Sequence, residues 1–438
     1  MAVDPKFMRT ETKVVRRAKD AGARKLSVDI CVVGSGAAGT SAALEAAALG
    51  RKVALVDGLP TLGGQAVNSI IGLFVGFFSG GDQKHVPYQI THGIADRMFA
   101  DLGAQGALDY RVGPTTTNIM YDEVALQRWI ERAIAEAGII PIVGAIVSNV
   151  AMEGRRVREL ELTTRYGKLR VEAQGFVDAS GDASLAWQAG LPCREAAEGP
   201  IYGTQMLVLE NIDMQHAPDR FAFAERVAAK HKQYGLPRGD GFAFVAPGRG
   251  IALVNMTHIE TPLEPVAMSR IQLEGKAQAD KAIAFLKAEY PDAFRNARVR
   301  AYGQPGVRQT RWIVGTHQLT ADEVRKGVKF PDAIARCAWP IELHSREEGY
   351  VWEPFGHDHM HYVPLGSITC ADADNLMAAG RCIDGDAAAL SSVRVMGPCM
   401  AMGKAAVNAL DLAGAGSVHQ IDIAALQERL KDNLVRTD

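Results

Sequence analysis

The first strongly patterned part of the chain predicts a strand, a turn and a helix. Residues 28–33 are mostly apolar and β-branched, glycines follow at once, and an alanine-rich pattern runs from Ala37 to Leu49. Gly50 ends the predicted helix, and residues 52–57 form a second buried strand. Two strands joined by a crossover helix run parallel, so the pattern predicts a βαβ unit in a parallel sheet.

Later segments extend this sheet and add a small antiparallel layer. An amphipathic pattern over residues 124–134 predicts a helix that leads to a strand near 142–147. Short alternating segments at 156–162 and 168–171 are separated by turn residues and predict a small antiparallel meander. Residues 173–178 then return as a buried strand.

The pattern changes between residues 203 and 365 and changes back afterwards. This stretch mixes strands, a long polar helix around 270–289 and irregular pieces rich in Gly, Pro and His. Residues 375–380 and a small-residue helix at 398–413 again predict strand, turn and helix. We therefore expect an α/β chain with an inserted mixed α+β domain, divided as a basic N-terminal arm at 1–26, the first part of the main domain at 27–202, the inserted domain at 203–365 and the C-terminal part of the main domain at 366–438.

Length and charge narrow the class of protein. A chain of 438 residues is long enough for at least two hydrophobic cores. The net charge of -2 gives no positive field that would hold a nucleic acid. Six cysteines form no C-x-x-C pair, which is typical of reduced thiols in a cytoplasm.

Two further features favour a cytoplasmic protein without a transmembrane segment. The most apolar run, residues 70–78, is far shorter than the roughly 20 residues that span a bilayer. Residues 1–25 lack the apolar core of a secretion signal.

A glycine motif follows the first strand directly. The sequence G-S-G-A-A-G has the strand, turn and helix context of a Rossmann-type dinucleotide site. Its first glycine permits the tight turn, the second lets the backbone approach a pyrophosphate, and the third lets helix and strand pack closely. Asp57 ends the second strand and is expected to accept hydrogen bonds from the adenosine ribose. The predicted contacts are Gly34, Ser35, Gly36, Ala37, Ala38, Gly39 and Asp57.

NAD and FAD share this motif, and other segments decide between them. L-G-G-Q at 62–65, V-D-A-S-G-D at 177–182 and the stretch 375–403 resemble the remaining flavin contacts of glutathione-reductase-like flavoproteins. G-V-R-Q-T-R-W-I-V-G at 306–315, A-G-R-C-I at 379–383 and S-V-R-V-M-G-P-C-M-A-M-G at 392–403 complete a resemblance that covers residues 28–413.

The family that the chain resembles is the FAD-dependent oxidoreductases related to fumarate reductase and succinate dehydrogenase flavoproteins. The resemblance implies an FAD-binding domain, and we expect noncovalent FAD because residues 59–65 offer no histidine for covalent attachment. It extends the predicted FAD contacts to Gly63, Gly64, Gln65, Val147, Ala179, Ser180, Gly181, Asp182, Gly380, Arg381, Met396 and Gly397.

A physical argument supports the C-terminal contacts. A strand that ends at Gly380 and a helix that begins near Pro398 can bring the positive end of the helix dipole to the flavin pyrimidine edge. The backbone N–H groups of Met396 and Gly397 would then stabilise the negative charge that reduction places on the flavin.

Three arginines are candidates for substrate contact. In fumarate-reductase relatives an arginine of the comparable C-terminal segment clamps a substrate carboxylate, so the resemblance implies this role for Arg394. Arg308 and Arg311 lie three residues apart and could share a helical face. For all three, a structural ion pair is the alternative.

Three histidines alternate at His357, His359 and His361. If this segment is extended, their imidazoles lie on one side. One of them can serve as general base, since relatives use a histidine from the lobe that returns to the flavin domain. Metal ligation and ordinary loop positions are the alternatives, and we expect no metal. Tyr362 is a weaker candidate for a hydrogen bond to substrate.

The predicted function is oxidation of a small polar, carboxylated substrate, with hydride transfer to flavin N5 by a dehydrogenase or oxidase. One alternative is fumarate-reductase-like reduction of an activated C=C bond, and another is a non-catalytic dinucleotide-binding protein. The electron acceptor stays open between oxygen, a quinone and a partner protein, as does assembly into a homo-oligomer.

Overall fold

A computed structural model describes most of the chain. The described residues are 12–16, 18, 22–81, 84–113, 115–196, 201–246, 249–347 and 349–436. Much of the predicted N-terminal arm at 1–26 lies outside them. In the described part of the chain, no helix is long and apolar enough to cross a membrane.

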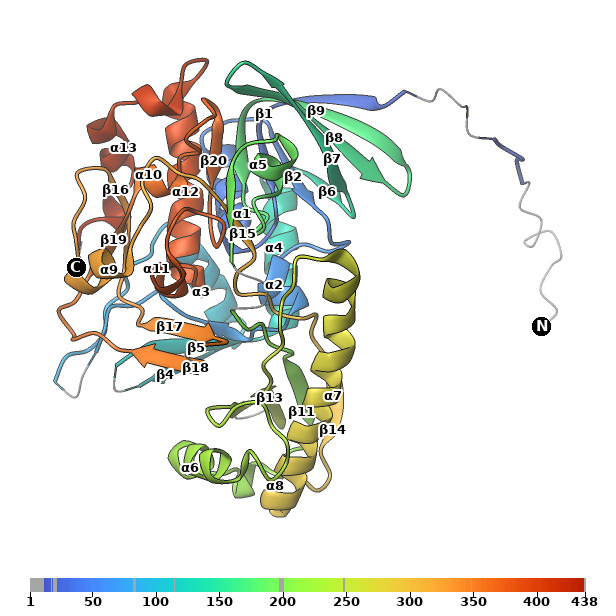
Figure 1. The fold of residues 1–438 in the computed structure, drawn as a ribbon, viewed down its shortest axis with the longest axis vertical. Helices are drawn as coiled ribbons and strands as arrows, with labels where there is room; N and C mark the ends of the chain where they lie inside the picture. The colour runs from blue at the N-terminus through green and yellow to red at the C-terminus, as the bar shows by residue number, and fades with distance from the viewer. Residues whose placement is uncertain are drawn as a thin grey trace.

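A parallel sheet forms the centre of the fold (Figure 1). Its strands run in the order β6-β2-β1-β9, and β20 pairs with the end of β9. Every pairing among these five strands is parallel, which confirms the predicted βαβ arrangement. The strands are β1 (Arg24–Val33), β2 (Val53–Asp57), β6 (Ile140–Val143), β9 (Gly167–Asp178) and β20 (Leu376–Ala378).

The predicted antiparallel meander continues this sheet. β7 (Ile146–Glu153), β8 (Arg156–Thr164) and the first half of β9 pair antiparallel to one another. β9 therefore belongs to both layers: residues 167–172 pair with β8, and residues 176–178 pair with β20.

Two small-residue helices pack closely beside the sheet. They are α1 (Ala37–Ala48) and α12 (Met396–Ala413). A Cβ added to Gly403 in α12 would lie only 2.2 Å from the carbonyl oxygen of Ala38 in α1, so the contact requires glycine at this position. This packing brings the C-terminal part of the chain against the first glycine motif.

A second sheet with its own core forms the lower lobe in Figure 1. Phe223 of α6 (Arg220–Lys230) and Phe285 of α7 (Pro265–Glu289) pack against it in a cluster separate from that of the central sheet. The strands, in spatial order, are β12 (Phe242–Ala246), β13 (Ile251–Asn255), β11 (Leu207–Glu210) and β14 (Arg298–Tyr302). The lobe is the inserted mixed α+β unit that the sequence pattern predicts.

Residues 311–364 form short strand pairs beside the central sheet. Their buried side chains, among them Trp312, Trp339 and Val363, belong to the same core as the central sheet. The sequence pattern predicts that the inserted unit ends at residue 365. Because of the shared core, we propose instead that it ends near residue 302. The strand pairs are β10 (Cys193–Glu195) with β15 (Arg311–Ile313), β16 (Ala333–Cys337) with β19 (His361–Pro364), and β17 (Ile341–Ser345) with β18 (Gly349–Glu353).

The remaining described elements connect these layers. They are α2 (Gly64–Asn68), β3 (Leu73–Phe74), α3 (Ile94–Ala104), β4 (Leu108–Val112), β5 (Thr117–Tyr121), α4 (Glu123–Glu136), α5 (Ser184–Gln188), α8 (Pro291–Phe294), α9 (Ala321–Lys326), α10 (Leu365–Ile368), α11 (Ala387–Val393), α13 (Ile423–Arg429) and three 3-10 turns, at Met214–His216, Val418–Gln420 and Lys431–Asn433.

Candidate active site

The three glycines of the first motif have different surroundings. A Cβ on Gly34 would lie 2.1 Å from the Ala179 carbonyl oxygen and 2.7 Å from the Ser180 nitrogen. A Cβ on Gly39 would lie 1.8 Å from the Gly34 carbonyl oxygen. Apart from its chain neighbours, no atom of the described residues lies within 4 Å of a Cβ built on Gly36. The first and third glycines are therefore required by packing, while the second faces open space that a pyrophosphate can fill.

The N-terminus of α1 faces the same open space. Gly36 is its N-cap residue and supplies no side-chain cap, so the first-turn N–H groups, including those of Ala37 and Ala38, are left for a ligand. The next glycine motif lies against this turn, because the Gly63 N–H donates to the Ser35 carbonyl oxygen at 3.2 Å.

Asp57 ends β2 beside this turn. One carboxylate oxygen accepts from the N–H and the hydroxyl of Ser35 at 2.7 and 2.6 Å, and the other accepts from the Leu59 N–H at 2.8 Å. Asp57 thus shapes the loop, and its hydrogen bond to a ribose stays a prediction. The Ala145 N–H donates to the Asp57 carbonyl oxygen at 3.0 Å, which places Val147, at the start of β7, near the same end of β2.

The second glycine motif joins the first motif to a distant segment. A Cβ on Gly64 would lie 2.6 Å from the Gly36 Cα, so the two loops touch through their backbones. The side-chain amide of Gln65 donates to the Val307 carbonyl oxygen at 3.0 Å and accepts from the Val307 N–H at 3.2 Å. These two hydrogen bonds hold the 306–315 segment against the glycine loops.

The loop after β9 pins the same segment from the other side. The Asp182 carboxylate accepts from the Thr310 hydroxyl at 2.5 Å and from the Arg381 guanidinium at 3.0 Å. Gly181 has a φ of +79°, and a Cβ there would lie 2.4 Å from Arg381 Nε. The residues predicted from three separate motifs thus form one connected network.

The N-terminus of α12 differs from the prediction in one respect. The Gly397 N–H donates to the Val75 carbonyl oxygen at 3.1 Å, and a Cβ on Gly397 would lie 2.0 Å from the Gly76 carbonyl oxygen. Because this N–H already has a protein acceptor, the proposed hydrogen bond from Gly397 to the flavin is not supported. Met396 stays the predicted donor, and Gly380, with a φ of +87°, turns the chain after β20.

Two of the predicted arginines lie in a mostly buried setting next to this network. Arg308 donates from Nη1 to the Tyr202 carbonyl oxygen at 2.7 Å, and Arg394 donates from Nη2 to the Glu342 carbonyl oxygen at 3.2 Å. Burial, together with the charges of Arg394 and Arg238, lowers the pKa of Arg308. Among the described residues, neither Arg308 nor Arg394 has a carboxylate oxygen within 4.0 Å. Their charge is therefore available to an anionic ligand.

A model of the family described as FAD dependent oxidoreductase matches residues 29–430. The chain belongs to this family. It is an FAD-dependent enzyme, and FAD is its cofactor. The non-catalytic alternative is thereby excluded.

One curated relative is distant in sequence. Digeranylgeranylglycerophospholipid reductase 2 of Methanothermobacter thermautotrophicus is 26% identical over 226 residues, which are 51% of this chain and 57% of the relative. The match therefore spans less than two thirds of that relative's length.

Two solved structures show a similar outline. One is a geranylgeranyl bacteriochlorophyll reductase-like protein of Thermoplasma acidophilum, with 14% identity, a TM-score of 0.46 and coverage of 93% of this chain and 83% of the other. The other is an anhydrotetracycline hydroxylase of Streptomyces rimosus, with 13% identity, a TM-score of 0.42 and coverage of 93% and 68%.

The geometry around the first glycine motif fits a bound FAD. The open space at Gly36 and the uncapped first turn of α1 suit the diphosphate, and the Asp57 end of β2 suits the adenosine half. Gln309 supports a ligand nearby, since its side-chain nitrogen is buried without a hydrogen-bond partner among the described residues.

Arg311 lies away from the other arginines. It is the first residue of β15, so it does not share a helical face with Arg308, and that expectation is wrong. Its guanidinium bonds the Glu195 carboxylate at 2.9 Å and lies 3.8 Å from the centroid of a Trp187 ring. These contacts support the structural ion-pair alternative for Arg311.

The alternating histidines do not share one side of an extended strand. Residues 357–358 form a turn, and β19 begins only at His361. His357 stacks on His85 with ring centroids 3.7 Å apart, whereas His359 Nε2 lies 3.1 Å from His361 Nδ1. The condition for three imidazoles on one face is thus not met.

His361 is the most enclosed of the three. It is fully buried, and its Nε2 lies 2.9 Å from the Ser392 hydroxyl. Burial lowers the pKa of His361 to about 3. Tyr362 points to the opposite side of β19, where Lys329 Nζ lies 5.8 Å from its ring centroid. Catalytic roles for the three histidines and Tyr362 stay predictions, because none of these contacts joins them to Arg308 or Arg394.

The structure instead surrounds the arginines with residues that the sequence reasoning missed. Arg238 pairs with Asp240, and its Nε lies 3.0 Å from the Asp240 carboxylate. His258, His344 and Glu342 form a hydrogen-bonded chain nearby. These residues come from separate segments of the second lobe and from β17, and no short motif marks them. In the described part of the chain, no three His, Cys, Asp or Glu side chains come together to hold a metal.

Proposed function

We propose that this flavoenzyme oxidises a small organic anion whose carboxylate is held by Arg308 and Arg394. The observation that supports this substrate class is the pair of mostly buried guanidinium groups without a carboxylate partner within 4.0 Å among the described residues. Burial of unpaired like charges is unfavourable, and a bound carboxylate removes that cost through bidentate hydrogen bonds.

The two arginines come from segments that belong to the FAD site. Arg308 lies between Val307, which is pinned by Gln65, and Thr310, which is pinned by Asp182. Arg394 is the C-cap residue of α11 and lies two residues before the start of α12. A carboxylate bound between Arg308 and Arg394 would therefore lie beside the part of the cofactor that these segments contact.

Bound FAD supplies an acceptor for a hydride at flavin N5. The protein's part is to hold the substrate so that its C–H bond faces that acceptor. The planar guanidinium of Arg394 fixes the orientation of a carboxylate, because two parallel hydrogen bonds restrict its rotation. Arg308 adds a second charge that stabilises the bound anion in a setting with little water.

An anaerobic screen tests the proposal. The oxidised holoenzyme is mixed with lactate, malate, alanine and glutamate, and with the methyl ester of each, while flavin absorbance is followed. We expect at least one free acid to bleach the flavin and its ester to do so far more slowly. Bleaching by esters as fast as by acids would contradict an arginine-bound carboxylate.

Reduction of an activated C=C bond is the second candidate. The curated relative is named a reductase, and the same arginines would bind the carboxylate of an unsaturated acid. In this case fumarate and acrylate reoxidise the dithionite-reduced holoenzyme under argon, and none of the saturated acids bleaches the oxidised enzyme. The two directions are thus separated by which redox form of the enzyme reacts.

A further inference from the structure

Three side chains next to the arginine site form a directional hydrogen-bond chain. His258 Nε2 lies 3.0 Å from His344 Nδ1, and His344 Nε2 lies 3.3 Å from a Glu342 carboxylate oxygen. The other Glu342 oxygen accepts from the Trp339 indole N–H at 3.1 Å. An ionised carboxylate only accepts, so His344 donates from Nε2 and must accept at Nδ1. His258 then carries its proton on Nε2, and its Nδ1 is unprotonated.

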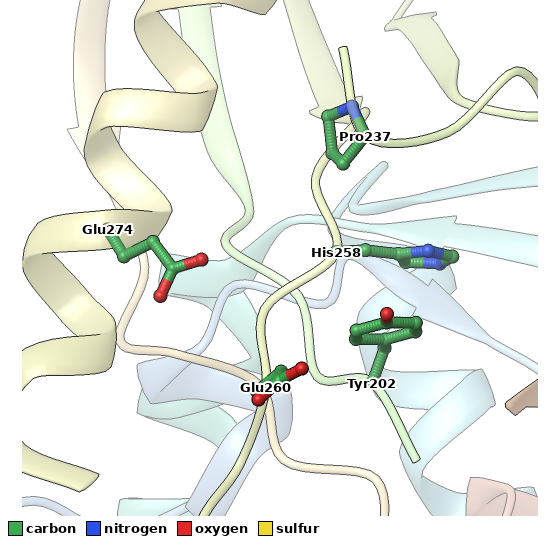
Figure 2. Close-up of a pocket in the computed structure, with 5 residues that line it drawn as sticks. All are labelled: Tyr202, Pro237, His258, Glu260 and Glu274. Carbon is green, nitrogen blue, oxygen red and sulfur yellow. The ribbon is translucent and has the colours of Figure 1, made fainter. Parts of the chain in front are cut away.

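His258 also forms part of a cavity wall. The cavity has a volume of about 290 Å³ and is lined by Tyr202, Pro237, His258, Glu260 and Glu274. Figure 2 shows the rings of His258 and Tyr202 lying one over the other, with centroids 4.9 Å apart and planes 9° apart. The Tyr202 carbonyl oxygen is the acceptor for Arg308, so one residue separates the cavity from the arginine site.

The groups around the two imidazoles keep both rings neutral. Burial, and after it the charges of nearby arginines, lower the pKa of His258 and of His344 far below the usual value. A neutral imidazole can still pass a proton on, because it accepts at one nitrogen while it releases from the other. The charged and titratable groups around the pair and its cavity are Arg238, Arg308, Arg394, Asp240, Glu342, Glu260, Glu274, Tyr202 and Tyr350.

We propose that His258 is the catalytic base of the oxidation and that His344 and Glu342 are its positioning residues. The inference rests on the proposed function. In the step, the substrate O–H or N–H bond breaks and its electron pair forms the new double bond to carbon. The C–H electron pair leaves with the hydride to FAD.

The proton follows the chain of hydrogen bonds. It arrives at His258 Nδ1, the Nε2 proton of His258 moves to His344 Nδ1, and the Nε2 proton of His344 moves to Glu342. One proton ends on Glu342 while both rings stay neutral, as their surroundings require. After product release, the reverse shift returns the proton to water through the cavity.

Nitrogen NMR of the holoenzyme labelled with ¹⁵N-histidine tests the positioning without any substrate. Long-range proton–nitrogen spectra give the tautomer of each ring, and His258→Gln assigns the signal. We expect His258 to be neutral with its proton on Nε2 from about pH 5 to 9. In Glu342→Gln, whose amide can also donate, the single tautomer should become a mixture. A charged His258 below neutral pH, or a tautomer unchanged in Glu342→Gln, would overturn the proposal.

Stopped-flow kinetics test the catalytic role with the panel acid that bleaches the native enzyme fastest. His258→Gln should lower the rate constant of flavin reduction by about 10²–10⁴-fold, with the Kd for the acid within about threefold of native. In His258→Ala, added imidazole should restore part of the rate by entering the vacated space.

The control is His216→Gln, since this ring is half-exposed and its ion pair among the described residues is with exposed Asp213. It should reduce at the native rate. Native reduction by His258→Gln would refute the base assignment while leaving the arginine site intact. If no panel acid bleaches the native enzyme, the proposed oxidation fails, and the NMR result still decides whether the hydrogen-bond chain exists.

Discussion

Two matched glycine substitutions separate the cofactor's space from the fold's own packing. In Gly36→Val the new Cβ meets no atom of the described residues within 4 Å, apart from its chain neighbours, and the φ of -67° is one that L-residues adopt. We expect the flavin-free protein to lose at most about 1 kcal/mol, the usual cost of a poor N-cap residue. In Gly39→Val the Cβ would lie 1.8 Å from the Gly34 carbonyl oxygen, so the cost should reach about 3 kcal/mol or more.

Bound FAD adds a second effect to the Gly36 variant. Valine at Gly36 fills the space assigned to the pyrophosphate, so FAD should no longer bind. The variant then also loses the stabilisation that ligand binding gives, about 2.7 kcal/mol at a hundredfold excess over Kd. Urea unfolding of the flavin-free proteins and FAD titration by fluorescence give both quantities. A native FAD Kd in Gly36→Val, or native stability in flavin-free Gly39→Val, would show that the assigned roles are wrong.

The remaining predictions concern single contacts. Asp57→Ala should weaken FAD binding by roughly 1.5–3 kcal/mol, measured as the change in Kd, and no change would remove Asp57 as ribose partner. Arg394→Lys keeps the charge but loses the bidentate fork, so it should slow substrate-dependent flavin reduction while FAD content stays native. Arg311→Lys should lower the free energy of unfolding by about 1 kcal/mol through Trp187 and Glu195, with native reduction kinetics. Heat denaturation should release intact FAD, whereas colour retained on the polypeptide would indicate covalent attachment.

The sequence predicted the elements whose residues are close together in the chain. The βαβ unit and the meander follow from apolar periodicity and turn glycines close in the chain. The need for glycine at Gly39 also follows from the local strand-turn-helix geometry, because a Cβ there would meet Gly34, five residues earlier. The need for glycine at Gly34 comes from Ala179 and Ser180 after β9, which the local pattern does not bring near. Contacts between motifs, such as Gln65 with Val307, depended on the resemblance and on the structure.

The directions of the side chains near the proposed substrate site could not be predicted, because they depend on contacts between segments that are far apart in the sequence. Arg311 turns to Glu195 because β15 pairs with β10, 116 residues earlier in the chain. His357 lies in a turn that alternation of histidines could not reveal. His258 and His344 meet across 86 residues, and each is an isolated histidine in the sequence. Only their long-range contact distinguishes them from other single histidines in the sequence.

The dependence of binding on substrate charge tests the central claim most directly. The measurement is the Kd from flavin absorbance for a panel acid and for its uncharged amide, in the native holoenzyme and in Arg308→Gln. The account predicts that the native enzyme prefers the acid by at least about tenfold, a difference of about 1.4 kcal/mol, and that Arg308→Gln loses most of this preference. Equal affinity of the native enzyme for acid and amide would contradict an anionic substrate held by Arg308 and Arg394.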